Sequence, residues 1–303
     1  MRGDFLAYRE HFPNTPELPS TDPDATARFT EATAALADPA SATSRAVDAA
    51  LAGSEVVLVR GFLGNWMPGN LVQVRRALRR RGADAWIARH AAGRTIEDNA
   101  ARLAARLATS GDRPLWLLGH SKGGMEALGA ATRPHVEARL RGVLTAQTAR
   151  GPSPVLESLL ERKHQASLSG WHRRLAEAVQ RIGLRLIGAH VGGLELTGER
   201  IRAAARRADE VVRPYPHVQA ASWSIRPTTW LDSFHERLGE IAPGVAHDGQ
   251  FYLHDLIWPN TPNVLLGEVD HAQPAMGGFG FDPVAFWLAM VAVALGRPGS
   301  SGG

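Results

Sequence analysis

The sequence contains no cysteine. This absence excludes a disulfide framework, a thiolate metal site and a cysteine nucleophile. It also lacks an uninterrupted run of about 18 apolar residues, which a membrane-spanning helix needs, and its first ten residues have no apolar centre of a secretory signal. We therefore expect a soluble, cytoplasmic protein, with secretion left open for the case that the natural chain begins further upstream.

Lysine is almost absent, because Lys122 and Lys163 are the only two among 34 basic residues. The 30 acidic residues leave a formal charge of +4, and no basic cluster stands apart from amphipathic helical patterns. The sequence therefore does not predict a nucleic-acid-binding surface. It also lacks the H-E-x-x-H spacing of metal hydrolases, so we expect no metal and no cofactor.

Short apolar runs alternate with helical patterns along most of the chain. Predicted strands lie at 55–60, 85–88, 115–119, 142–146, 218–225 and 263–267, and predicted helices at 71–81, 96–110, from 121 or 122 onward, 230–238 and 283–295. This alternation predicts an α/β fold with a mostly parallel, doubly wound sheet and helices on both faces.

Two segments interrupt the alternation. Residues 1–52 form an Ala-rich helical arm that we expect to pack outside the core, and residues 151–212 form an Arg-rich, mostly helical insertion that we expect to act as a cap or lid. The α/β core would then comprise residues 53–150 and 213–298. Residues 299–303 are rich in glycine and serine and indicate a flexible tail.

A candidate nucleophile lies in Gly119-His120-Ser121-Lys122-Gly123, which matches the pattern G-x-S-x-G. The pattern recurs at residues 299–303, but that copy has no strand before it and no helix after it. The internal copy follows an apolar strand and precedes a helix-forming run, which is the context of a nucleophile elbow. There the serine sits on a strained turn, glycines allow close backbone approach, and the helix N-terminus faces developing negative charge. The alternative is an ordinary glycine-rich turn.

A serine nucleophile needs a histidine as base and a carboxylate that orients the histidine. His271 follows the last predicted strand, at the carboxyl edge where such sheets bind ligands. Asp248, in a turn-like loop before that strand, is the predicted acid. Its rivals are Asp232, inside a predicted helix, and Asp255, beside apolar residues.

An oxyanion hole needs two backbone N–H donors. We expect one from Lys122, directly after the nucleophile, and one from Phe62, in the glycine-bearing loop after the first strand. We expect an acyl chain to lie between this loop and the insertion, against Trp66, Met67, Leu184, Leu186, Ile187 and Val191. The insertion residues could instead form the core of the cap itself.

Three segments resemble bacterial true lipases, the triacylglycerol lipases and their esterase relatives in the α/β-hydrolase superfamily. They are residues 60–64, residues 119–124, and the late pair of His247-Asp248-Gly249 with Asp270-His271. The resemblance implies an α/β-hydrolase fold with a helical lid, and cleavage of carboxylic esters through an acyl-enzyme. It does not extend to Arg60, where the family usually has histidine, or to Gln273, where a calcium-site aspartate often stands.

The same triad could serve a thioesterase, an acyltransferase or a polyester depolymerase, and a non-catalytic binding protein can share the fold. Dehalogenases and epoxide hydrolases of this fold carry an aspartate at the elbow, so Ser121 argues against both. The expected partner is a small-molecule or lipid ester, with contact to a lipid surface as a further hypothesis.

Overall fold

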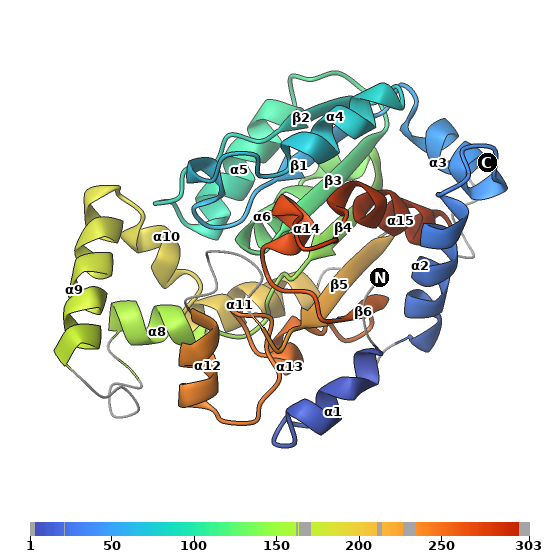
Figure 1. The fold of residues 1–303 in the computed structure, drawn as a ribbon. Helices are drawn as coiled ribbons and strands as arrows, with labels where there is room; N and C mark the ends of the chain where they lie inside the picture. The colour runs from blue at the N-terminus through green and yellow to red at the C-terminus, as the bar shows by residue number, and fades with distance from the viewer. Residues whose placement is uncertain are drawn as a thin grey trace.

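The computed structural model describes residues 4–20, 22–161, 163, 171–210, 214–226 and 234–296. Its centre is a six-stranded sheet in the order β2-β1-β3-β4-β5-β6, in which every neighbouring pair is parallel (Figure 1). The strands are β1 (Glu55–Val59), β2 (Asp84–Ile87), β3 (Leu115–His120), β4 (Leu140–Ala146), β5 (His217–Trp223) and β6 (Asn263–Gly267). The predicted α/β class and parallel sheet are confirmed.

The strand order reverses once. The chain moves from β1 outward to β2 and then returns, so that β3 pairs with the other side of β1. In open parallel sheets such a reversal leaves a crevice beyond the carboxyl ends of the two central strands. The loop after β1 and the turn after β3 meet at this point, and they carry Gly61 to Gly64 and Ser121.

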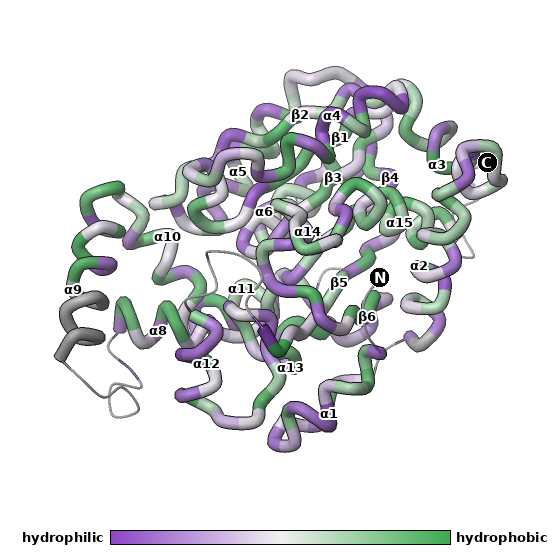
Figure 2. The backbone as a smooth tube through the Cα atoms, in the orientation of Figure 1, coloured by the Kyte–Doolittle hydropathy of each residue, from purple (hydrophilic) through white to green (hydrophobic). Residues whose placement is uncertain are grey.

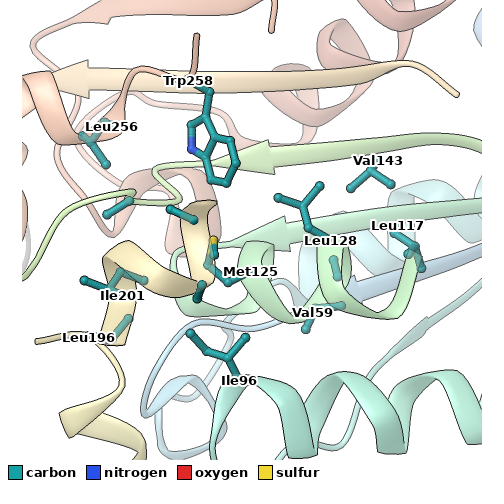
Figure 3. Packing of buried hydrophobic residues seen from close by; sticks show 14 of the residues in the cluster. Val59, Ile96, Leu117, Met125, Leu128, Val143, Leu196, Ile201, Leu256 and Trp258 are labelled. Atoms are coloured by element: carbon teal, nitrogen blue, oxygen red, sulfur yellow. The ribbon is translucent and has the colours of Figure 1, made fainter. Parts of the chain in front are cut away.

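Both faces of the sheet are buried, which explains why its strands are continuous apolar runs. Along β1, Val57 and Val59 belong to one hydrophobic layer, while Val56 and Leu58 belong to the other. The first layer holds α5 (Ile96–Leu107), α6 (Lys122–Ala131) and α11 (Gly198–Asp209). Figure 3 shows Met125 of α6 within this packing, close to the sheet.

The second layer includes the N-terminal arm, which differs from the expectation that residues 1–52 pack outside the core. Phe29 of α2 (Pro23–Ala35) and Leu51 of α3 (Ala42–Leu51) are fully buried in it. Both helices pack against α15 (Pro283–Leu295), as does α4 (Val72–Arg80). Since α15 also contacts β4 and β5, it is enclosed on several sides, and its apolar character extends around the helix (Figure 2).

Between β4 and β5, the described residues form α8 (Pro154–Glu161), α9 (Trp171–Leu186), α10 (His190–Leu194) and α11. Helices α8, α9 and α10 contact one another and gather at one end of the molecule, away from α2 and α3 (Figure 1). Helix α11 differs, because it packs on α6 and buries Ile201 in the core layer. The described part of the predicted insertion is thus helical, but its last helix, α11, belongs to the hydrophobic layer that also contains α5 and α6.

The remaining short helices are η1 (Phe5–Ala7), α1 (Tyr8–His11), η2 (Gly64–Trp66), α7 (Pro134–Glu137), α12 (His235–Ile241), α13 (Leu253–Leu256) and α14 (Gln273–Met276). Helix α12 covers the second half of the helix predicted at 230–238, and residues 230–233 lie outside the described residues, as does the tail 299–303. Among the helices described, none has the length and hydropathy to cross a bilayer.

Candidate active site

Ser121 occupies a strained turn between β3 and α6. Its backbone has φ 56° and ψ −130°, a region that residues with a side chain seldom adopt. The positions of Gly119 and Gly123 leave no room for a Cβ atom. A Cβ on Gly119 would lie 2.5 Å from a backbone Cα in the first turn of α6, and a Cβ on Gly123 would collide with the carbonyl oxygens of Val59 and Arg60. The motif therefore has the geometry expected of a nucleophile elbow.

The loop after β1 lies directly against this turn. A Cβ added to Gly61 would be only 2.9 Å from the Cβ of Ser121. The loop is closed by a hydrogen bond of 2.9 Å from the Gly64 N–H to the Gly61 carbonyl, with Leu63 at φ 60°. Lys122 is the first residue of α6, so its N–H has no acceptor within the helix. Phe62 and Ser121 line the same cavity.

His271 and Asp248 are hydrogen-bonded. The Nδ1 atom of His271 lies 2.7 Å from Oδ2 of Asp248, which is fully buried. The other oxygen, Oδ1, accepts the N–H groups of Gln250 and Phe251, each at 2.9 Å. Since an ionised carboxylate only accepts, the proton of the imidazole is placed on Nδ1 and Nε2 is left as an acceptor.

A second histidine supports the loop that carries His271. His120, just before the nucleophile, donates from Nε2 to the His271 carbonyl at 2.7 Å. Gln147, at the end of β4, donates to the neighbouring Asp270 carbonyl at 2.7 Å and to Ser222 Oγ at 2.7 Å. Burial and the nearby His271 lower the pKa of His120 to about 4, so His120 is neutral at ordinary pH.

The sequence patterns mark no role for His120, which stands within the elbow motif, or for Gln147. Two signals could have found them: His120 stands beside the nucleophile, and Gln147 follows the carboxyl end of β4, at the edge where the site forms.

Ser121 and His271 open into one cavity of about 370 Å³ with mostly apolar walls. Phe62 and Met67 line it from the loop after β1, and Phe251 and Ala275 from the C-terminal part of the chain. Helix α9 contributes Gln180, Gly183 and Leu184, and Ile187, directly after the helix, continues the same spacing of three and four, which places residues on one helical face. The cavity has the size and character of a site for a small, largely apolar ligand.

The predicted substrate residues divide between this cavity and the surface. Met67, Leu184 and Ile187 line the cavity, whereas Trp66 and Leu186 do not and are 62% and 82% exposed. The helical period explains the correction for Leu186, because one residue turns the side chain by about 100° away from its neighbour. Val191 is half exposed and, like Trp66, borders a separate surface hollow.

No protein-family model matches the sequence, and no curated protein matches it. Among solved structures, the chain is similar to the metagenomic carboxyl esterase MGS0156, with a TM-score of 0.59 and 18% identity over 80% of this chain and 75% of that one. It is also similar to the mature form of the Bacillus licheniformis lipase BlEst2, with a TM-score of 0.57 and 20% identity over 78% of this chain and 92% of that one. The chain has the α/β-hydrolase fold.

Within this α/β-hydrolase fold, Arg60 and Gln273 have defined contacts at the two positions where the sequence departs from the lipase pattern. Arg60 donates from Nε and Nη2 to the Asn70 carbonyl, at 3.2 and 3.0 Å, and so bridges the two ends of the loop after β1. Gln273 accepts the Asp270 N–H through Oε1 at 2.9 Å, and its own N–H donates to Asp270 Oδ1 at 3.0 Å. Gln273 thereby shapes the turn that follows His271.

Of the two rival acids, Asp255 does not line the cavity that holds Ser121 and His271. Asp255 lies 3.6 Å from His254 and against the backbone of Gly151, and burial raises its pKa. Asp232 lies outside the described residues. The α/β-hydrolase fold thus brings His271 to Asp248 and places His271 in one cavity with Ser121.

Proposed function

We propose that this α/β-hydrolase is a serine hydrolase that cleaves carboxylic esters through an acyl-enzyme. The observation that carries the proposal is the Asp248–His271 hydrogen bond of 2.7 Å beside a cavity that His271 shares with the strained Ser121. Geometry of this kind is how serine hydrolases activate a hydroxyl that is otherwise a poor nucleophile at neutral pH.

In the proposed reaction, the Ser121 oxygen attacks the ester carbonyl carbon while Nε2 of His271 accepts the hydroxyl proton. Asp248 stabilises the resulting imidazolium and holds its orientation. The N–H groups of Phe62 and Lys122 stabilise the oxyanion. The tetrahedral intermediate then collapses, the C–O bond to the alcohol breaks, and His271 returns the proton to the departing oxygen. Water repeats the sequence to release the acid and free serine.

The apolar walls of the cavity support an acyl group as the part of the substrate that is held there. Phe62, Met67 and Leu159 would contact this chain, and Leu184 of α9 would cover it together with Ile187, directly after that helix. In this proposal α8 and α9 act as the lid, because both line the cavity, together with α10, which contacts both of them.

A fluorophosphonate probe tests the proposal directly. It should label the wild-type chain and leave Ser121→Ala unlabelled, since only an activated serine attacks phosphorus at a useful rate. A series of nitrophenyl esters from acetate to palmitate would then give the preferred acyl length. Labelling that persists in Ser121→Ala, or no turnover of any activated ester by the wild type, would contradict the proposed function.

A further inference from the structure

A second cavity of about 370 Å³ lies beyond the carboxyl end of β2, beside α5. Its lining residues include three arginines, the buried side chains of His90 and Glu126, and apolar residues such as Leu103. None of them lines the cavity that contains Ser121. The proposed esterase reaction uses none of these side chains.

The inner end of this cavity is polar and deeply buried. Glu126 is 1% exposed, and its Oε1 atom accepts Lys122 Nζ at 2.6 Å and Asn99 Nδ2 at 2.8 Å. Its other oxygen, Oε2, lies 3.5 Å from His90 Nδ1 and has no hydrogen-bond partner within the described residues. Both ring nitrogens of His90 likewise have no hydrogen-bond partner among the described residues, although the His90 side chain is only 4% exposed.

Buried polar groups in folded proteins are almost always paired with protein, water or ligand atoms. Burial lowers the pKa of His90, so the ring is neutral and offers one donor and one acceptor. Glu126 Oε2 offers an acceptor. A hydroxyl group donates one hydrogen bond and accepts another, so it can bridge Glu126 Oε2 and the N–H of His90.

The remaining charge of the cavity comes from three arginines. Arg102 and Arg106 stand four residues apart on α5 and therefore share one face, and the Arg106 guanidinium lies 5.0 Å from the Trp86 ring centroid. Arg89 lines the cavity from the loop after β2. Because Lys122 already offsets the charge of Glu126, the arginines leave a net positive site, and guanidinium groups bind carboxylates and phosphates through paired hydrogen bonds.

We propose that this cavity binds a small organic anion that carries a hydroxyl group. The anionic group pairs with Arg102 and Arg106, and the hydroxyl donates to Glu126 Oε2 and accepts from His90. The apolar side chains of Ile87 and Leu103 contact the carbon atoms between the two ends. Hydroxycarboxylates and phosphate monoesters of polyols share this chemistry.

The test is isothermal titration calorimetry on the full chain with Ser121→Ala, so that it does not depend on the proposed ester hydrolysis. The probes are 3-hydroxybutyrate and glycerol 3-phosphate, which distinguish the two classes of anion. Butyrate and propyl phosphate are the matched probes, with the same carbon skeletons and no hydroxyl. We expect a measurable Kd for one hydroxylated probe and binding at least tenfold weaker for its matched partner.

Variants then assign the site. Arg102→Gln with Arg106→Gln should weaken binding at least tenfold, whereas Arg76→Gln with Arg80→Gln makes the same charge change on α4, outside both cavities, and should leave Kd unchanged. Leu103→Trp should abolish binding by filling the cavity, and thermal unfolding checks that it is folded. Absence of binding for both hydroxylated probes at 10 mM, as expected of a cavity that holds only water, or binding that survives these variants, would overturn the proposal.

Discussion

His271 and Asp248 are joined by two hydrogen bonds, one between side chains and one between backbones. Besides the bond of 2.7 Å from Nδ1 to Oδ2, the His271 N–H donates to the Asp248 carbonyl at 2.8 Å. The two loops that follow β5 and β6 are therefore fixed to each other, and the imidazole has little freedom to turn away from the carboxylate. A substitution of the Asp248 side chain can therefore change which ring nitrogen of His271 carries the proton, while the backbone hydrogen bond still holds the loop of His271 in place.

Asp248→Asn should lower kcat for a nitrophenyl ester by about 10³- to 10⁴-fold, because the amide favours the wrong tautomer of His271. The amide oxygen can still accept the Gln250 and Phe251 N–H groups that now bind Oδ1, so the variant should fold. Steady-state kinetics and thermal unfolding measure the two effects separately. A folded Asp248→Asn variant with kcat within tenfold of wild type would remove Asp248 from the proposed triad.

Leu186, the last residue of α9, and Ile187, directly after it, provide a matched pair for testing the proposed acyl-binding wall. Ile187→Ala should raise KM severalfold for long-chain nitrophenyl esters but not for the acetate, since it removes apolar surface from the cavity wall. Leu186→Ala removes a side chain of the same size that is 82% exposed and should leave both KM values unchanged. Equal changes in KM for the two substitutions would show that Ile187 does not contact the bound acyl chain.

Gly123→Ala should destabilise the fold by several kcal/mol, because the new methyl group collides with the Val59 and Arg60 carbonyl oxygens and the rigid strand end cannot move aside. Gly239 in α12 has no atom within 4 Å of a Cβ built on it. Gly239→Ala should therefore stabilise the protein by about 0.5–1 kcal/mol. Urea unfolding followed by circular dichroism measures both, and a Gly123→Ala variant as stable as wild type would contradict the packing described at the elbow.

Two buried histidines should make the fold sensitive to mild acid. Burial lowers the pKa of His120 to about 4 and that of His247, which also faces His235, to about 3. Unfolded histidine binds its proton near pH 6.5, so the unfolded state holds more protons below that pH and the free energy of unfolding falls as the pH decreases.

Between pH 6.5 and 4.5 each of these histidines should cost roughly 2 kcal/mol of stability. The free energy of unfolding, measured in urea at each pH, should decline less steeply in His247→Gln than in wild type. His11, on the surface, offers a control in His11→Gln, which should keep the wild-type slope. Parallel slopes for His247→Gln and wild type would disprove the contribution of His247.

The parts of the fold that local sequence determines were predictable. The strand at Glu55–Val59 is a β-branched apolar run that ends at a glycine, and its bounds were predicted to within one residue. Ser121 was recognisable because the strand, the turn and the helix that make its conformation are adjacent in the sequence. His271 and Asp248 could be proposed from their order along the chain and from their positions near strand ends.

Features that depend on packing between distant segments were not predictable. The contact of His120 with the His271 carbonyl joins residues 151 positions apart, and no local pattern marks it. The burial of Phe29 in the core depends on α15, more than 240 positions later, so an amphipathic arm resembled a surface helix. The choice between Leu186 and Ile187 depends on the exact rotation of α9 over the cavity, which composition does not determine.

The enclosure of α15 bears on how the chain emerges from the ribosome. Helices α2 and α3 are made long before α15, against which they pack, so Phe29 and Leu51 remain without part of their native cover until α15 has been synthesised. Deletion of residues 283–296 should therefore yield a nascent product that chaperones retain. Helices α2 and α3 complete their shared layer only once α15 has left the ribosome.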